Sequence, residues 1–305
     1  MRSSSLLLLS LLAAPAFAQV PAQGFALERL DAAPAGAGWL QNDELNLDGP
    51  LAGAASFTMG YAHLPLRVGG LGVVTHQAFG TVAAAVQWTR FRLSVDLVAP
   101  VDVSGVSGEV AGVSYTAPAV NLEQNPDAIS DVRLGLEARL FGAPGAPFRF
   151  GVGVQLFVPS GARDQYVSDE TLRSVARALF AGDVRWFSWA AHLGVHARPL
   201  DDGTWPQSPR GPEALAGLAL GARLTQVGPG LELLLGPELS AVTAFKAALQ
   251  RDTTGVEALI SARLEHHLTP AVSWRVRLAG GVGLHPSFGV PAWRVVLGVE
   301  LLGHE

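Results

Sequence analysis

The stretch AVSWRVRLAGGVGL (residues 271–284) decides the fold of this chain, and PAWRVVLGVEL (residues 291–301) repeats its pattern. A period of two is typical of a β-strand, because successive side chains point to opposite faces of a sheet. A continuous apolar face opposed by arginine and glycine is typical of a transmembrane barrel strand, with lipid outside and a polar lumen inside. In the first stretch, Val272, Trp274, Val276, Leu278, Val282 and Leu284 oppose Ser273, Arg275, Arg277, Gly281 and Gly283.

The same alternation recurs along the chain and predicts twelve strands. Short and long connections alternate between them, as in outer-membrane barrels with short periplasmic turns, longer extracellular loops and both termini in the periplasm. We therefore predict an all-β, antiparallel, up-and-down transmembrane barrel. A soluble β-sandwich also alternates, but its strands usually run ~5–6 residues and its solvated face is seldom so rich in glycine. The predicted strands lie near residues 54–62, 73–87, 91–101, 130–141, 148–158, 174–184, 187–198, 213–225, 231–242, 255–265, 271–284 and 291–302.

The predicted connections differ in length and composition. Residues 102–129 form the longest one, which could fold inward as a constriction, form an extracellular hairpin or be mobile. The other long ones, rich in Gly, Pro, Asp and Ser, lie near 63–72, 159–173, 199–212, 243–254 and 285–290. Short turns lie near 88–90, 142–147, 185–187, 226–230 and 266–270.

The N-terminal region predicts export. Arg2, an apolar run and Ala16-Phe17-Ala18 are typical of a secretory signal peptide over residues 1–18, cleaved after Ala18. We expect an irregular periplasmic segment over residues 19–53, which either tucks into the barrel or lies on its periplasmic side. The barrel should follow over 54–302, with a tail over 303–305, in the cell outer membrane. Past residue 18, the chain contains no long uninterrupted apolar stretch of the kind a membrane helix needs.

Composition excludes several classes of function. The formal net charge is −5 without a basic cluster, so we expect no nucleic-acid partner. The chain has no cysteine, which rules out disulfides and thiolate metal sites. We also expect no cofactor.

Charged side chains on the polar faces of the strands form the candidate site. Their signs nearly balance, whereas a selective ion pore needs one sign at its constriction. They predict either a lumen closed by ion pairs or a narrow channel with basic and acidic walls. We favour the structural network, because narrow barrels fill with side chains and unpaired charges there are costly. The candidates are Arg92, Asp96, Arg133, Glu137, Arg139, Arg198, Arg223, Glu257, Arg263, Glu265, Arg275, Arg277, Arg294 and Glu300.

Aromatic residues gather near strand ends, as in the interfacial girdles of outer-membrane barrels. Most lie beside predicted short turns, and we expect Trp274 and Trp293 to mark opposite rims of the lipid-facing band. The predicted girdle residues are Trp88, Phe91, Phe148, Trp186, Trp189, Trp274 and Trp293.

Other candidate chemistry has simpler explanations. His192 and His196 lie about 13 Å apart on a strand, too far to share a metal ion. Ser188 shares their face, but no third orienting group and no G-x-S-x-G motif is evident, so we predict no enzyme. We interpret the remaining loop carboxylates as solvated, since their spacing matches no calcium loop. These are Asp164, Asp169, Glu170, Asp201 and Asp202.

Five short segments of the chain look familiar: FALERL (25–30), GW (38–39), YAHLPL (61–66), FVPSGARD (157–164) and FGVPAWRVVLG (288–298). Together they resemble a known family, the N-terminal barrel region of large OmpA-type outer-membrane proteins. The resemblance covers roughly residues 25–302 and implies an architecture rather than a chemistry. In that family a periplasmic peptidoglycan-binding domain often follows the barrel. We expect the present chain, which stops at Glu305, to lack that domain and cell-wall tethering.

These observations together predict an integral outer-membrane β-barrel with a structural role or slow passive passage of small solutes. The alternatives are a substrate-selective porin or transporter and, with less support, an outer-membrane enzyme. The expected partners are outer-membrane lipids, lipopolysaccharide and small solutes, with the barrel assembly machinery during insertion.

Overall fold

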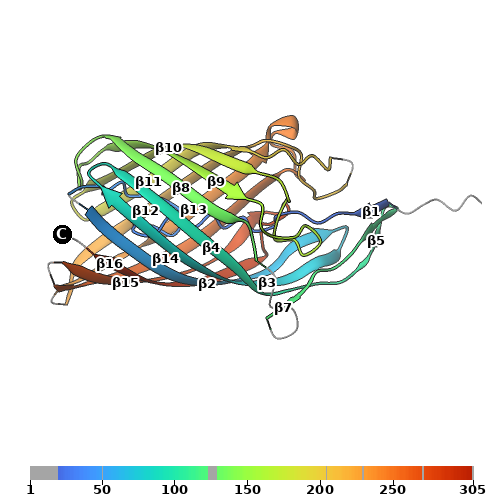
Figure 1. Cartoon of the computed structure of the whole chain (residues 1–305), viewed down its shortest axis with the longest axis horizontal. Coiled ribbons are helices and arrows are strands. Elements are labelled where there is room, and N and C mark those ends of the chain that lie inside the picture. The colour runs from blue at the N-terminus through green and yellow to red at the C-terminus, as the bar shows by residue number, and fades with distance from the viewer. Residues whose placement is uncertain are drawn as a thin grey trace, which may run out of the picture.

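Twelve long antiparallel strands close into a barrel in the computed structural model, which describes residues 20–49, 51–122, 129–203, 205–228, 230–269 and 271–303 (Figure 1). Each strand pairs with its neighbour in sequence, and the last pairs with the first, so the predicted all-β barrel of twelve strands is confirmed. No described helix is long and apolar enough to span a membrane. The barrel strands are β2 (Leu51–Val68), β3 (Leu71–Trp88), β4 (Phe91–Ser104), β8 (Val132–Phe141), β9 (Arg149–Val158), β10 (Arg173–Val184), β11 (Phe187–Ala197), β12 (Glu213–Gly228), β13 (Leu231–Ala244), β14 (Thr254–Thr269), β15 (Val272–His285) and β16 (Trp293–Gly303).

The strands turn their apolar side chains outward. On β16, the side chains from Trp293 to Leu301 at every second position are 42–55% exposed, whereas Arg294 is 1% exposed. A soluble protein would bury such a continuous apolar face, because its removal from water is the main favourable contribution to folding. Here the apolar face encircles the barrel and the arginines point inside, which is the arrangement that lipid requires.

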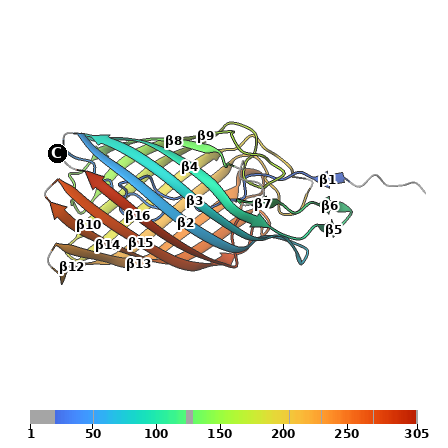
Figure 2. The same cartoon turned by 60° about the horizontal axis from the view of Figure 1, so that its bottom comes forward.

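The two ends of the barrel differ. The end with the short turns carries the start of β2 and the end of β16, and the other end carries the long loops (Figures 1 and 2). The prediction of a loop over residues 63–72 is wrong, because β2 and β3 continue to a two-residue turn at Gly69 and Gly70. Both glycines have positive φ, at 53° and 92°, which permits so tight a hairpin.

The long connection after β4 contains a hairpin, one of the three alternatives that composition left open. Strands β5 (Gly108–Val110) and β6 (Val113–Tyr115) form it, and β7 (Ala119–Asn121) returns to pair with β4. Residues 123–128 lie outside the described part. A short 3-10 turn, η1 (Phe245–Ala247), lies in the loop between β13 and β14.

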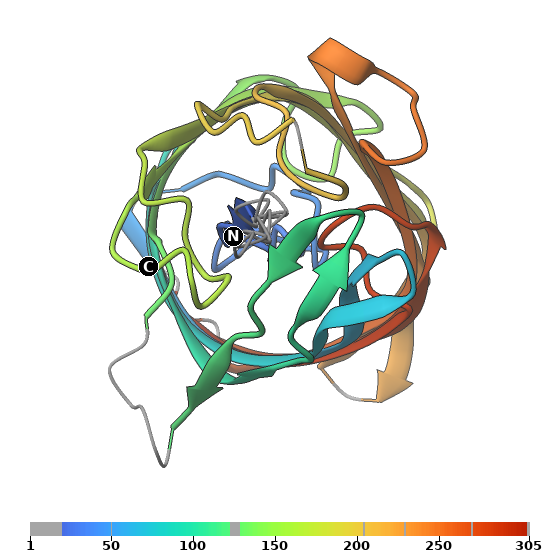
Figure 3. The ribbon, with the colours of Figure 1, turned by 90° about the vertical axis from the view of Figure 1, so that its right-hand side faces the viewer.

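The N-terminal part of the chain runs through the barrel. Strand β1 (Val20–Ala22) pairs in parallel with β6 at the long-loop end, far from Gly303 at the short-turn end (Figure 1). Residues 23–49, the plug segment, then descend inside the ring of strands to the start of β2 (Figure 3). Of the two positions that the sequence left open for this segment, the structure shows the first, inside the barrel. The expectation that both termini lie at the same end is wrong for the described residues, because β1 and Gly303 lie at opposite ends of the barrel. The signal peptide predicted over residues 1–18 lies outside the described part.

An apolar cluster at the long-loop end anchors the upper part of the plug segment. Phe25 and Leu27 are buried there among residues of β2, β3, β4 and the long loops. The Phe25 ring contacts Tyr166 and Phe288 edge to face, with centroids 5.6 and 5.0 Å apart. The first barrel strand begins earlier than predicted, because residues 51–53 belong to β2 rather than to the irregular segment.

Candidate functional site

The plug segment supplies carboxylates to the arginines of the inner wall. Arg92 of β4 donates to Asp43 of the plug segment and, at 2.8 Å, to Glu137 of β8. Its second terminal nitrogen donates to the carbonyl oxygen of Gly36, at 3.2 Å. One guanidinium thus joins two wall strands to two points of the segment, as its fan of five donors allows.

A second group of charges surrounds Glu300 of the last strand. Glu300 accepts the backbone N–H of Gly36 at 2.6 Å and a hydrogen bond from Arg275 at 2.7 Å. The same nitrogen of Arg275 donates to the carbonyl of Ala37 at 2.7 Å. Arg277, two residues further along β15, donates to the carbonyl of Trp39 at 3.2 Å, and the carbonyl of Gly38 between them accepts from Arg263 of β14 at 2.9 Å.

Glu44 of the plug segment faces strands β12 and β14. It accepts from Arg263 at 2.8 Å and from Arg223 at 3.5 Å, and Arg223 also donates to Asp183 at 3.0 Å. The backbone carbonyl of Glu44 accepts from Arg149 at 2.7 Å. Buried charges of this kind persist in proteins when they are paired and their remaining donors are satisfied.

Glu238 of β13 holds the turn of the plug segment with a fully buried carboxylate. Its two oxygens accept the backbone N–H groups of Leu40 and Gln41, both at 2.9 Å. Next to this turn, Trp39 is buried among wall residues, and its ring lies over Gly221. A Cβ built at Gly221 would lie 2.6 Å from that ring, so the glycine provides room for it.

Nearer the long loops, the ion pairs continue in the same way. Arg294 donates to Glu28 of the plug segment at 2.7 Å and to Glu257 at 2.8 Å. Arg29 makes a two-point pair with Glu213, with both distances 2.7 Å. The plug segment therefore carries charges of both signs, each opposite its complement on the wall.

Asp169, predicted to be a solvated loop acid, is instead buried. It accepts two hydrogen bonds from Arg198, both at 2.6 Å, and the backbone N–H of Ala26 at 2.7 Å. Burial by itself would raise the pKa of Asp169, but Arg198 and Arg173 outweigh it and hold this pKa below its usual value. The prediction for Asp169 is wrong because its loop, residues 159–172, packs against the plug segment. Asp164, Glu170 and Asp201 are exposed as predicted, and Asp202 is half-buried. Asp202 pairs with Arg163 and Asp201 with Lys246.

Every charged residue predicted to line the lumen has a partner inside the barrel or at its mouth. What the prediction lacked is the plug segment, which provides Glu28, Asp31, Asp43 and Glu44 as counter-charges. The sequence does contain these four carboxylates, directly before a set of strands rich in inward-facing arginines. That imbalance could have indicated that the segment pairs with the strands. Remaining pairs include Arg133 with Asp96 and Asp31, Arg275 with Glu265, and Arg139 with the carbonyl of Leu47.

The predicted girdle residues lie on the outer surface, mainly at the short-turn end. Trp88 stacks on Phe91 across the β3–β4 turn, with centroids 5.8 Å apart, and Phe148 lies 6.3 Å from Trp189. Trp186 is exposed in the β10–β11 turn. Trp274 lies beside the β14–β15 turn, whereas Trp293 begins β16 at the other end, 5.1 Å from the ring of Tyr61.

The histidines and the serine of β11 have separate partners. His192 hydrogen-bonds with Asn42 of the plug segment, and His196 with Glu213, both at 3.0 Å. Ser188 donates to Asp183 at 2.7 Å. His192 therefore joins the wall to the plug segment, whereas His196 and Ser188 pair with residues of the neighbouring strands β12 and β10.

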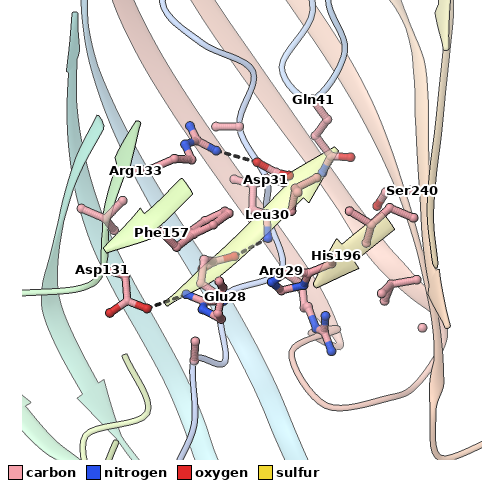
Figure 4. Close-up of a pocket in the computed structure, with 18 of the residues that line it drawn as sticks. Glu28, Arg29, Leu30, Asp31, Gln41, Asp131, Arg133, Phe157, His196 and Ser240 are labelled. Carbon is pink, nitrogen blue, oxygen red and sulfur yellow. Dashed lines mark hydrogen bonds and ion pairs between the residues drawn. The ribbon is translucent and has the colours of Figure 1, made fainter. Parts of the chain in front are cut away.

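Within the described part of the barrel, an outer and an inner cavity are lined by different parts of the plug segment. The outer cavity, about 140 Å³, is lined by residues 28–32 of the plug segment and by the long-loop halves of the strands (Figure 4). The inner cavity, about 280 Å³, opens toward the short turns and includes Gly36 and Glu44 of the segment. In this conformation the plug segment divides the lumen.

The barrel is similar to solved outer-membrane proteins. An outer-membrane channel from Pseudomonas putida F1 has a TM-score of 0.50 at 14% identity, over 84% of this chain and 95% of that one. The NanC porin has a TM-score of 0.49 at 7% identity, over 82% and 100%. LpxR from Salmonella typhimurium has a TM-score of 0.38 at 11% identity, over 82% and 100%. No protein-family model and no curated sequence matches the chain. At these identities the similarity shows the fold alone, a β-barrel of the outer-membrane kind.

Proposed function

We propose that this protein is an outer-membrane channel for passive passage of small solutes, closed in the present conformation by its plug segment. The observation that carries the proposal is the division of the lumen into two cavities by residues 23–49. The solved outer-membrane channel from Pseudomonas putida F1, which shares the barrel fold, supports assignment to the class of channels. The OmpA-type resemblance of the sequence and export through a cleaved signal peptide belong to the same proposal.

The chemistry of the plug segment explains why passage would be slow. The segment has no strand pairing inside the barrel and is held by side chains of the wall, such as Arg92, Glu238 and Arg275. A hydrogen bond to a charged group contributes about 1.5–3 kcal/mol, so several must break together before the lumen opens. Openings of the intact protein should therefore be rare and brief.

Planar-bilayer recording tests the proposal directly. We expect infrequent openings from the intact chain and a steady, larger conductance from a variant lacking residues 23–49. Silence from both proteins, with the barrel folded, would instead favour the structural role.

A reversible lock tests the same proposal without deleting the plug segment. Ala35 packs in one cluster with Ala83 and Ala85 of β3, so we choose Ala35 and Ala83 as the positions for a pair of cysteines that oxidation would join. The chain has no other cysteine. We expect the oxidised double variant to be silent and to recover its openings on reduction. The single variant Ala83→Cys is the matched control and should ignore the redox treatment, and equal conductance of the oxidised and reduced double variant would contradict a moving plug.

A further inference from the structure

We propose that the outer cavity is a binding site for an uncharged, ring-sized molecule that carries a hydroxyl group. The proposal deepens the channel function by naming a class of solute, and it rests on that function for its biological meaning. The cavity lies between the plug segment and the wall, so a bound molecule would touch both (Figure 4).

The volume of the cavity sets the size of the molecule. Its free space is about 140 Å³. An engineered apolar cavity of about 150 Å³ in another protein holds one benzene molecule. The outer cavity therefore has room for one six-membered ring with a small substituent.

The charges around the cavity cancel, which argues against an ionic ligand. Four arginines and four carboxylates line it, and each is paired with a group of opposite charge. An anion or cation entering the cavity would lose its hydration without finding an unpaired counter-charge, which is costly in a confined site. The charged lining residues are Arg29, Arg133, Arg173, Arg198, Glu28, Asp31, Asp131 and Glu257.

Apolar side chains form much of the remaining wall. Phe79 and Phe157 are the aromatic members, and Arg173 covers the ring of Phe157, with the guanidinium carbon 4.7 Å from its centroid. Walls of this kind suit the body of an apolar ring, because ligand sites are mostly apolar with a few placed polar groups. The aliphatic members are Leu30, Val98, Val167, Val175, Leu215, Val242 and Val290.

Polar atoms without a partner point to a hydroxyl group. Gln41 is 4% exposed and its Nε2 donor is unpaired, and His196 is 6% exposed and its Nε2 is unpaired. Glu28 Oε2, an acceptor, has no hydrogen-bond partner, and neither do the Nε donors of Arg29 and Arg173. These residues all line the cavity and come from the plug segment and from two strands. A hydroxyl both donates and accepts, so it can satisfy a donor such as Gln41 or an acceptor such as Glu28.

Phenol and benzoate, which share a ring and differ in charge, make a direct test on the folded, intact chain in detergent. Calorimetric titration should show saturable binding of phenol with a dissociation constant in the millimolar range or below, and benzoate should bind at least tenfold more weakly. Phenol should also raise the thermal unfolding temperature with concentration, because a ligand of the folded state stabilises it.

Two variants locate the binding. Ser240 lines the outer cavity, so Ser240→Phe should fill it and weaken phenol binding at least tenfold (Figure 4). Gly53 lines the inner cavity, and a Cβ there meets nothing within 4 Å, so Gly53→Val is the matched control and should leave binding unchanged. Gln41→Leu keeps the side-chain volume but removes the Nε2 donor. It should weaken the binding of phenol more than the binding of benzene.

The outcomes separate this proposal from the channel function. Absence of saturable phenol binding, equal binding of benzoate, or unchanged binding in Ser240→Phe would overturn the site. Because titration does not depend on conductance, a folded barrel that binds phenol but never conducts would reject the channel and leave the site intact. A conducting barrel that does not bind phenol would reject the site alone.

Discussion

Arg198 and Asp169 form a buried two-point ion pair that also holds both backbone polar groups of Ala26. Asp169 accepts the Ala26 N–H at 2.7 Å, and Arg198 donates to the Ala26 carbonyl at 3.0 Å. Asp169 comes from a long loop and Arg198 directly follows β11, whereas Ala26 belongs to the plug segment. The relationship fastens the plug segment at the outer mouth of the barrel.

Asp169→Asn should loosen this attachment. The amide cannot neutralise Arg198, and removing one partner of a buried pair costs about 3–5 kcal/mol because the other charge is left uncompensated. We expect more frequent openings in planar-bilayer recordings and faster proteolysis of the plug segment at Gly24. Asp164→Asn, an exposed acid of the same loop, is the control. Unchanged openings in Asp169→Asn would show that the attachment does not limit gating.

The attachment at Asp169 should also depend on pH, but only in strong acid. Arg198 and Arg173 lower the pKa of Asp169 from its model-peptide value of 3.8. A lowered folded-state pKa contributes stability that is complete above the unfolded value and is lost as the pH falls through the folded value. The other acidic groups that act on Arg198 and Arg173 are Glu213, Asp202 and Asp131. We expect equal opening frequencies at pH 7 and pH 5 and an increase near pH 3, and an increase already at pH 5 would assign control to other groups.

Glu238→Ala should release the turn of the plug segment in the middle of the lumen. The buried N–H groups of Leu40 and Gln41 would then lose their acceptor, at about 1–3 kcal/mol for each unsatisfied group. We expect longer openings than in the intact chain, measured as single-channel dwell times. Glu238→Gln keeps one acceptor oxygen and should fall between the two. Identical dwell times in all three proteins would count against a gating role for this turn.

Trp39→Ala should weaken the docking of the plug segment by removing its largest buried ring. Truncating a buried tryptophan typically costs about 3–5 kcal/mol. The variant should unfold at a lower temperature in detergent and open more often in a bilayer. Trp186→Ala is the matched control, because Trp186 is exposed on the outside of the barrel and should leave gating unchanged. A normal melting temperature for Trp39→Ala would mean that this contact is weak.

Single cysteines can test the position of the N-terminal end, since the chain has none of its own. With the short turns in the periplasm, Pro21→Cys should react with a membrane-impermeant maleimide on intact cells, because Pro21 is exposed at the long-loop end. Arg90→Cys, in the β3–β4 turn, should react only after the outer membrane is permeabilised. Labelling of Arg90→Cys but not of Pro21→Cys on intact cells would reverse the orientation.

The barrel wall was predictable because its information is local. In residues 271–284 and 291–301, alternation by itself separates the lipid-facing side chains from the inward ones. The closing pair of β16 with β2 follows from the even strand count and is present, with Leu301 opposite Ala55. The loop expected over 63–72 was misjudged because its glycines look like loop composition but form a tight turn between long strands.

The sequence alone thus determined the closed all-β barrel, the number of its strands, and which arginines and carboxylates turn inward, because each depends on a period of two along one strand. The tertiary structure alone decided where the counter-charges come from and whether the lumen is open. Residues 23–49 have no periodicity, so nothing local in them predicts a path. Their position results from contacts far apart in the chain, such as Gly36 with Glu300, and only the closed barrel brings those partners together.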